Sequence, residues 1–298
     1  TTRGCRDRAG VMKRGGTDKT STSYFLDRMA QASYKRVKEA RARNSEGQLV
    51  QRALTAPTPP PLVLDDFNII AELKMRSPAG GALTGKQFDR DTQIAAYASG
   101  GANAISVLTE PDEFSGSLRD LSEVTASLMD HRIPVMRKDF LTDPYQVLEA
   151  RIAGASGVLV IITMLSDSQI TALLDSAMEY GMFVLLEGFN EQDLERICSL
   201  KISDHSPAPI LCGVNCRDLK NLEINFDRFQ KLATHLPPDL PAVAESGIKE
   251  PADVITVAKL GYRAALIGSA LMRSTDAARE LVSLKNAGVE TVREVSCS

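Results

Sequence analysis

The chain has 298 residues, of which 43% are hydrophobic and 24% are charged, a composition typical of a globular protein and not of a largely disordered one. The formal net charge is −3 and aromatic residues make up 5% of the chain, so we expect no nucleic-acid partner. No apolar stretch reaches the roughly 18 residues that a membrane span requires, so we expect no membrane partner either.

Residues 1–22 are expected to form a mobile tail. The start of the chain is rich in Arg, Lys, Gly and Thr and lacks the apolar segment of a secretory signal. A plastid protein that keeps part of a transit peptide is the alternative, although Asp7 and Asp18 are unusual in such peptides.

The cysteines are scattered and contain no Cys-x-x-Cys pair. The spacing of His205, Cys212 and Cys216 matches no zinc site, so we expect no metal. Reduced cysteines are typical of cytosolic proteins, and a cytoplasmic location is therefore the first expectation.

A helical extension is expected ahead of the main domain. From Ser23 to about Arg43 the apolar residues recur at helical spacing, whereas residues 55–61 (Thr-Ala-Pro-Thr-Pro-Pro-Pro) break any regular element and form a stiff linker. The sequence thus predicts an extension with its linker over residues 23–61 and a catalytic domain over residues 62–298.

The remainder of the chain alternates between two patterns. Short apolar runs typical of strands occur at 68–74, 102–109, 134–140, 157–164, 183–189, 209–215, 242–247 and 264–271. Stretches with helical periodicity lie between them, among them 117–130, 143–153, 166–180, 190–200, 225–235 and 249–260. Cap residues such as Ser117, Ser166 and Asn190 stand where these helices begin.

Such alternation predicts parallel strands, and eight units in roughly 230 residues predict a closed (β/α)₈ TIM barrel with an N-terminal helical extension. An open doubly wound sheet is the alternative. Its dinucleotide-binding version is disfavoured, because no Gly-x-Gly-x-x-Gly follows the first strand.

Ionisable or polar residues end most of the predicted strands, where a barrel core alone would favour Val or Ile. They are Glu72 and Lys74, then Lys138, Glu187, Asn215 with Arg217, and Glu245. Strand periodicity places Glu72 and Lys74 on one face and turns Lys138 inward and Arg137 toward the helices. Because barrel active sites lie at these strand ends, the cluster indicates an acid–base site rather than structural or solvated ion pairs.

The last two strands end in Ser246-Gly247 and Gly268-Ser269. A phosphate site formed by the loops after strands seven and eight is a recurrent feature of this fold, and Ser77 from the first loop could complete it. The alternative is that these glycines only make tight turns.

Several motifs in order give a specific resemblance. They are Ile70-Ala71-Glu72-Leu73-Lys74 with Ser77-Pro78, residues 105–111, Arg137-Lys138-Asp139-Phe140 with residues 143–146, residues 215–219, Glu245-Ser246-Gly247-Ile248 and Ile267-Gly268-Ser269. With these motifs the chain resembles the indole-3-glycerol-phosphate synthase family from Ser23 to about Leu284. The resemblance implies a TIM barrel that uses no metal or organic cofactor, a phosphorylated small-molecule substrate, and association with other enzymes of tryptophan biosynthesis.

The reaction that the resemblance implies is the decarboxylating, dehydrating ring closure of 1-(2-carboxyphenylamino)-1-deoxyribulose 5-phosphate. Lys138 is then the general acid at the ribulose carbonyl. Glu187 and Lys74 serve the later proton transfers, Glu72 fixes Lys74, and Asn215 holds the developing hydroxyl group. Such chemistry favours lysines whose pKa is lowered toward neutrality by burial and a neighbouring cation.

The same resemblance implies the binding residues. Arg217 supports the site, and Phe114 and Phe140 form apolar walls for the aromatic ring. The phosphate is bound by Ser246, Gly247, Gly268, Ser269 and Ser77, and Glu245 is a further substrate-binding residue.

The chain departs from the family pattern at Ala79-Gly80-Gly81, at Gly188-Phe189 and at Cys216. A paralogue acting on a modified substrate, or a non-catalytic barrel that binds a phosphate ligand, is therefore an alternative. A phosphosugar isomerase or epimerase would need a different acid–base set from the paired lysines, and costly inward charges argue against a non-catalytic barrel.

Overall fold

The computed structural model describes residues 21–74, 76–77, 81–82, 88–200, 208–217 and 223–297. The first twenty residues of the expected tail lie outside this part, as do Ala79, Gly80 and His205, and the side chain of Ser77 is not described either.

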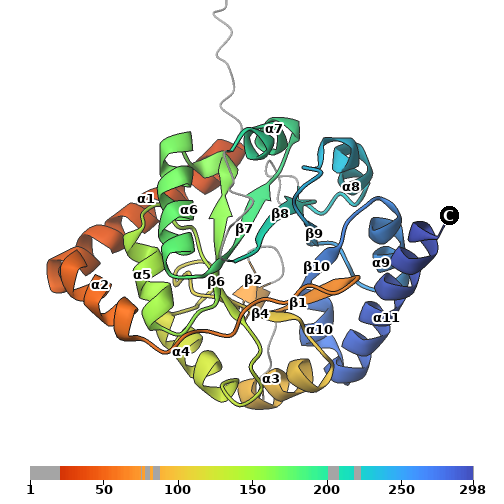
Figure 1. Cartoon of the computed structure of the whole chain (residues 1–298), viewed down its shortest axis with the longest axis horizontal. Coiled ribbons are helices and arrows are strands. Elements are labelled where there is room, and N and C mark those ends of the chain that lie inside the picture. Colours follow the sequence, from red (N-terminus) through yellow and green to blue (C-terminus); the bar gives the residue numbers. More distant parts are fainter. Residues whose placement is uncertain are drawn as a thin grey trace, which may run out of the picture.

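Eight parallel strands close into a barrel, which confirms the predicted (β/α)₈ fold (Figure 1). They are β1 (Asn68–Leu73), β4 (Ala104–Leu108), β5 (Val135–Lys138), β6 (Gly157–Ile161), β7 (Phe183–Gly188), β8 (Ile210–Asn215), β9 (Ala242–Glu245) and β10 (Ala264–Ile267). The barrel closes where β1 pairs with both β4 and β10. Two short strands, β2 (Arg76–Ser77) and β3 (Gly81–Ala82), form a separate antiparallel pair after β1.

Helices surround the strands, as Figure 1 shows. They are α3 (Arg90–Ser99), α4 (Leu118–Ser127), α5 (Tyr145–Ile152), α6 (Asp167–Glu179), α7 (Glu191–Ser199), α8 (Asp227–Leu232), α9 (Pro251–Lys259), α10 (Ser269–Arg273) and α11 (Ala277–Ser296), with short 3₁₀ turns η1 (Ile162–Met164) and η2 (Ala233–His235). The expected caps are present: the side chains of Ser117, Ser166 and Asn190 each accept a backbone N–H of the first helical turn. None of the helices in the described ranges is long and apolar enough to cross a membrane.

Alternation along the strands separates two apolar cores. Outward residues such as Val107 and Val184 pack against the helices, while inward residues such as Met136, Leu159 and Leu211 fill the barrel. Met136 and Lys138 are thus on the inner side of β5 and Arg137 on the outer side, as parity predicts.

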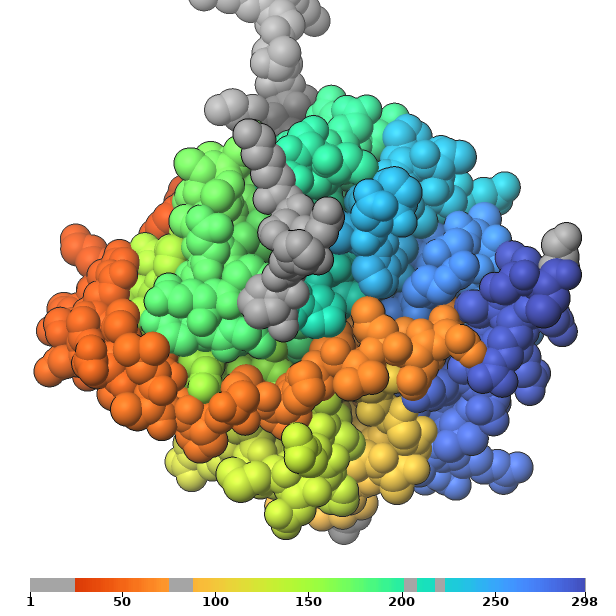
Figure 2. All heavy atoms as spheres, in the orientation of Figure 1, coloured from red at the N-terminus to blue at the C-terminus, as the bar shows by residue number. Residues whose placement is uncertain are grey.

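The extension contains two helices, α1 (Ser21–Arg43) and α2 (Glu46–Thr55). The sequence predicts the first but not the second, which is short and begins at a capping box made by Ser45 and Gln48. Helix α2 packs on α5 through Leu49 and Ala53. The segment that follows crosses the face seen in Figure 2 (orange) toward α11 (dark blue), where Arg293 pairs with Asp66 at 2.7 Å.

Candidate active site

A cavity of about 660 Å³ lies at the C-terminal ends of the strands. All of the expected site residues whose side chains the structure describes line it: Glu72, Lys74, Phe114, Lys138, Phe140, Glu187, Asn215, Arg217, Glu245, Ser246, Gly247, Gly268 and Ser269. They come from seven different strands and loops that only barrel closure brings together.

Lys138 stands at the centre of the polar side. Its Nζ donates to Glu245 Oε2 at 2.8 Å and to Glu187 Oε2 at 3.2 Å. Asn215 Nδ2 donates to the other oxygen of Glu187 at 2.9 Å, and Asn215 Oδ1 accepts the backbone N–H of Arg217 at 3.1 Å. Lys138, Glu187, Asn215 and Glu245, which come from four separate strands, therefore form one hydrogen-bonded network.

Glu72 and Lys74 form an ion pair beside this network, with Glu72 Oε1 and Lys74 Nζ 2.6 Å apart. Burial raises the pKa of Glu72, but Lys74 and Lys138 lower it by more, so its pKa lies below the usual value and the carboxylate stays ionised. A Cβ at Gly268 would lie 2.5 Å from Glu72 Oε1 and 3.1 Å from Lys74 Nζ, so this pair needs a glycine opposite it.

The expected lowering of the lysine pKa is wrong for Lys138. Burial does lower the pKa of Lys138, but the carboxylates of Glu187, Glu245 and Glu72 together raise it above its ordinary value. The sequence places these glutamates on the same rim, but their distances from Lys138 Nζ decide whether the pKa of Lys138 rises or falls. Lys138 is consequently a charged ammonium throughout the neutral pH range.

Glu245 has the opposite balance. Burial, followed by repulsion from Glu187, raises the pKa of Glu245 to about 8 despite its contact with Lys138. Its Oε1 has no hydrogen-bond partner among the described residues. A Cβ at Gly213 would overlap this same oxygen, so the missing side chain at Gly213 makes the room for the carboxyl group. The sequence analysis did not identify Gly213, because a glycine within a strand indicates that another group comes close but does not show which group.

The rim near β9 and β10 contains two successive residues in the left-handed backbone region. Ser246 and Gly247 both have left-handed φ angles, 69° and 78°. At Gly247 a Cβ would lie 2.9 Å from Cys216 Sγ, so glycine is required there. Gly268 and Ser269 begin the short α10 on the same rim.

The apolar side of the cavity consists of Phe114 and Phe140, whose ring centroids are 6.2 Å apart, and of Phe25 and Leu26 from α1. Phe25 packs edge-on against Phe140 with centroids 6.0 Å apart. Sequence reasoning missed these two residues of α1, because an apolar helical stripe shows which face is buried but not where it docks.

Phe189, from the Gly188-Phe189 departure from the family pattern, also lines this cavity. Phe189 is buried in the wall, and its N–H donates to Asp193 at 2.9 Å.

Among the described residues no group of His, Cys, Asp or Glu could hold a metal ion. The four cysteines in these ranges are free thiols.

Comparison with known proteins agrees with this geometry. The family model for indole-3-glycerol phosphate synthase matches residues 26–284. The chain belongs to this family. A relative of that name from Azospirillum brasilense is 40% identical over 210 residues, which cover 70% of this chain and 76% of that protein. One from a Nocardioides species is 44% identical with the same coverage, 70% and 76%, and one from Mycobacterium tuberculosis is 39% identical, covering 80% and 85%.

Solved structures that resemble this member of the synthase family support the fold alone, because their sequences are distant. The 3-hexulose-6-phosphate synthase from Salmonella typhimurium has a TM-score of 0.57 at 12% identity and covers 76% of this chain and 100% of that chain. A thiamine phosphate pyrophosphorylase from Pyrococcus furiosus has a TM-score of 0.52 at 14% identity, covering 76% and 97%.

Proposed function

We propose that the chain performs the reaction of the indole-3-glycerol phosphate synthase family with the hydrogen-bonded network of side chains around Lys138. In that reaction, 1-(2-carboxyphenylamino)-1-deoxyribulose 5-phosphate closes to indole-3-glycerol phosphate and releases carbon dioxide and water. The protein is then a decarboxylating carbon–carbon lyase of tryptophan biosynthesis. The observation that carries the proposal is the ammonium of Lys138, which is held by Glu187 and Glu245 in a cavity that aromatic side chains also line.

Ring closure comes first. The aromatic carbon that bears the carboxylate attacks the ribulose carbonyl, whose oxygen must take up a proton. The ammonium of Lys138 is the proton donor, since its pKa keeps it charged and it faces the cavity. Loss of carbon dioxide then returns the bonding electrons to the ring.

Dehydration needs an acid for the departing hydroxyl group and a base for a proton on the neighbouring methylene carbon of the new ring. Lys74, held by Glu72 at 2.6 Å, and Glu187, shared between Lys138 and Asn215, are proposed for these two roles. Asn215 has an amide that can orient the hydroxyl group, and Arg217 adds positive charge beside it. The raised pKa of Glu245 makes it a proton reserve in contact with Lys138.

The substrate ends occupy opposite sides of the cavity in this proposal. Phe114 and Phe140 contact the aromatic ring, and the phosphate lies against Ser246, Gly247, Gly268 and Ser269, with Ser77 completing the site. The separation of an aromatic wall from a glycine-rich rim supports this orientation.

The test is a fluorescence assay for indole-3-glycerol phosphate with purified protein, with Lys138→Ala as the control. Wild-type protein is expected to form product in a saturable way, and the variant to lose almost all activity. Absence of product from folded wild-type protein at saturating substrate would refute the proposal.

A cytoplasmic location and association with other enzymes of the pathway remain predictions, testable by fractionation and co-purification.

A further inference from the structure

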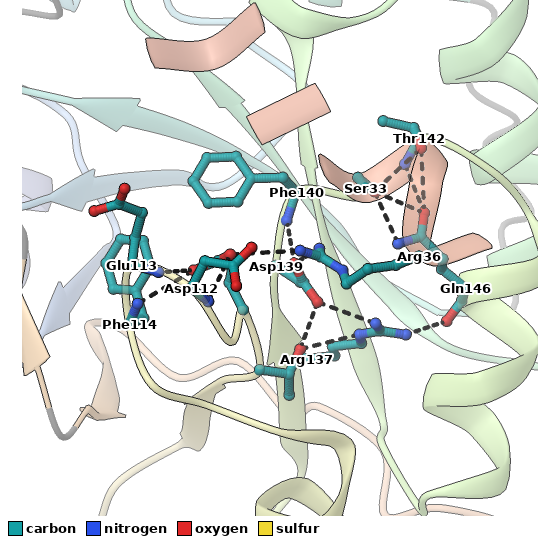
Figure 3. Close-up of polar contacts among 12 residues, drawn as sticks. Ser33, Arg36, Asp112, Glu113, Phe114, Arg137, Asp139, Phe140, Thr142 and Gln146 are labelled. Atoms are coloured by element: carbon teal, nitrogen blue, oxygen red, sulfur yellow. Dashed lines mark hydrogen bonds and ion pairs between the residues drawn. The ribbon is translucent and has the colours of Figure 1, made fainter. Parts of the chain in front are cut away.

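Helix α1 places one arginine between two buried carboxylates behind the aromatic wall. Arg36 Nη2 lies 2.7 Å from Asp139 Oδ1, and Arg36 Nη1 lies 3.4 Å from Glu110 Oε1 (Figure 3). The side chains of Asp139 and Glu110 are 1% and 0% exposed, whereas that of Arg36 is 25% exposed. The guanidinium therefore joins two loops of the barrel to the extension.

Glu110 holds the backbone that carries Phe114. Its Oε2 accepts the N–H of Glu113 at 2.7 Å and of Phe114 at 3.2 Å, and its Oε1 accepts the N–H of Asp112 at 3.0 Å. A carboxylate with three backbone donors fixes the turn that follows β4. The position of Phe114 thus depends on where Glu110 is held.

Asp139 does the same for Phe140. Its Oδ1 accepts the N–H of Phe140 at 2.8 Å, the same oxygen that faces Arg36. Its Oδ2 accepts from Thr109 at 2.8 Å and from Arg137 at 3.0 Å. Asp139 consequently keeps an ionic partner without Arg36, but loses its connection to Glu110.

The register of α1 is set by other contacts. Ser33 is buried and accepts from Gln146 Nε2 at 3.0 Å, and Leu26 and Met29 pack on the barrel. Arg36 is therefore not needed merely to keep the helix on the barrel. Its particular contribution is to fix the two carboxylates relative to each other and to Phe25, on the same helix.

We propose that Arg36 is a positioning residue for the aromatic side of the substrate cavity, acting through Glu110 on Phe114 and through Asp139 on Phe140. The inference rests on the proposed function, in which these rings contact the aromatic part of the substrate. Arg36 itself does not line the cavity. It follows that affinity for the aromatic end depends on a residue outside the barrel.

Arg36→Met tests this role, with Arg41→Met as the matched control. Arg41 lies on the same helix and pairs with Asp143 at 2.9 Å and Glu46 at 2.8 Å, but these contacts hold no cavity residue. In Arg36→Met we expect KM to rise about tenfold and kcat to change less than about threefold, because the walls bind substrate and transition state alike. The inhibition constant of inorganic phosphate should not change, and Arg41→Met should leave all three values unchanged.

Substrate binding measured by calorimetry in a Lys138→Met background separates this inference from the proposed function, since it needs no turnover. Addition of Arg36→Met should weaken binding about tenfold there too. Unchanged affinity in Arg36→Met, an equal loss in Arg41→Met, or a parallel loss of phosphate inhibition would overturn the positioning role. Failure of wild-type protein to form product would instead overturn the proposed function, and the calorimetric comparison would still decide the role of Arg36.

Discussion

Arg137 and Lys138 are consecutive residues of β5, and both are basic side chains with carboxylate partners, yet they face different regions of the molecule. Arg137 points into the layer between strands and helices, where its nitrogens donate to Thr109, to the Gln146 carbonyl oxygen, and to Glu149 and Asp139. Lys138 points into the barrel, where its carboxylate partners line an open cavity.

The two regions differ in how completely their polar atoms are paired. Every side-chain nitrogen of Arg137 has a protein partner in a closed environment, so nothing is left to interact with a ligand. Around Lys138 and Lys74 three acidic side chains, Glu72, Glu187 and Glu245, lie beside two ammonium groups, and Oε1 of Glu245 has no hydrogen-bond partner among the described residues. A buried charge with complete pairing indicates a structural role, whereas excess acid groups around a cation beside a cavity indicate chemistry.

The largest expected effect is that of Lys138→Met on turnover. Loss of the proton donor should lower kcat about 10³-fold, while the inhibition constant of inorganic phosphate changes less than about threefold. Steady-state fluorescence kinetics with phosphate as competitor measures both values. Equal losses in turnover and phosphate binding would contradict a role as general acid.

Arg137→Met is expected to act on stability. Its removal leaves Asp139 with fewer donors in a buried site, which should lower the free energy of unfolding by about 3 kcal/mol. Urea denaturation followed by circular dichroism measures this change. A variant as stable as the wild type would show that the outward network is not structural.

Glu245 should give stability a pH dependence. Because its pKa is raised to about 8 in the folded protein, the folded state holds this proton more tightly than the unfolded chain does. Its stabilising contribution is complete below the ordinary glutamate pKa of about 4.3 and is lost as pH rises through about 8. Relative to Glu245→Gln, wild-type protein should therefore lose about 2 kcal/mol between pH 5 and 6.5 in urea denaturation. A difference between the two proteins that does not vary with pH would contradict this assignment.

Gly213→Ala should have the smallest effect. The added Cβ overlaps Glu245 Oε1 and must displace the carboxyl group from Lys138, which should lower kcat about tenfold. Gly181→Ala is a control for the added methyl group, since Gly181 has no atoms near its Cβ position, although its φ of 64° adds some strain there. Equal kcat values for the two variants would show that Gly213 does not position Glu245.

The barrel and the residues of its polar network could be predicted from the sequence, because strand parity is a local property of the chain. Strand parity decides that Lys138 faces inward and Arg137 outward, and the closed fold brings all strand ends together. The distances within the network could not be predicted, and the direction of the pKa change at Lys138 depends on how close the carboxylates come to its Nζ.

The docking of the extension could not be predicted at all. The apolar stripe that includes Leu26 and Met29 indicates a buried helix face, but many faces of a barrel are apolar enough to receive it. The partners of Arg36 lie more than seventy residues away in sequence, at Glu110 and Asp139. Nothing local to either segment marks such a pair.

The central claim, that chemistry lies on the inner side of β5 and structure on the outer side, is tested most directly by measuring kcat of Lys138→Met and Arg137→Met in one assay at saturating substrate. The account predicts a loss of about 10³-fold for Lys138→Met and of less than about threefold for folded Arg137→Met. Similar losses in both variants, or a Lys138→Met protein that keeps wild-type turnover, would contradict it.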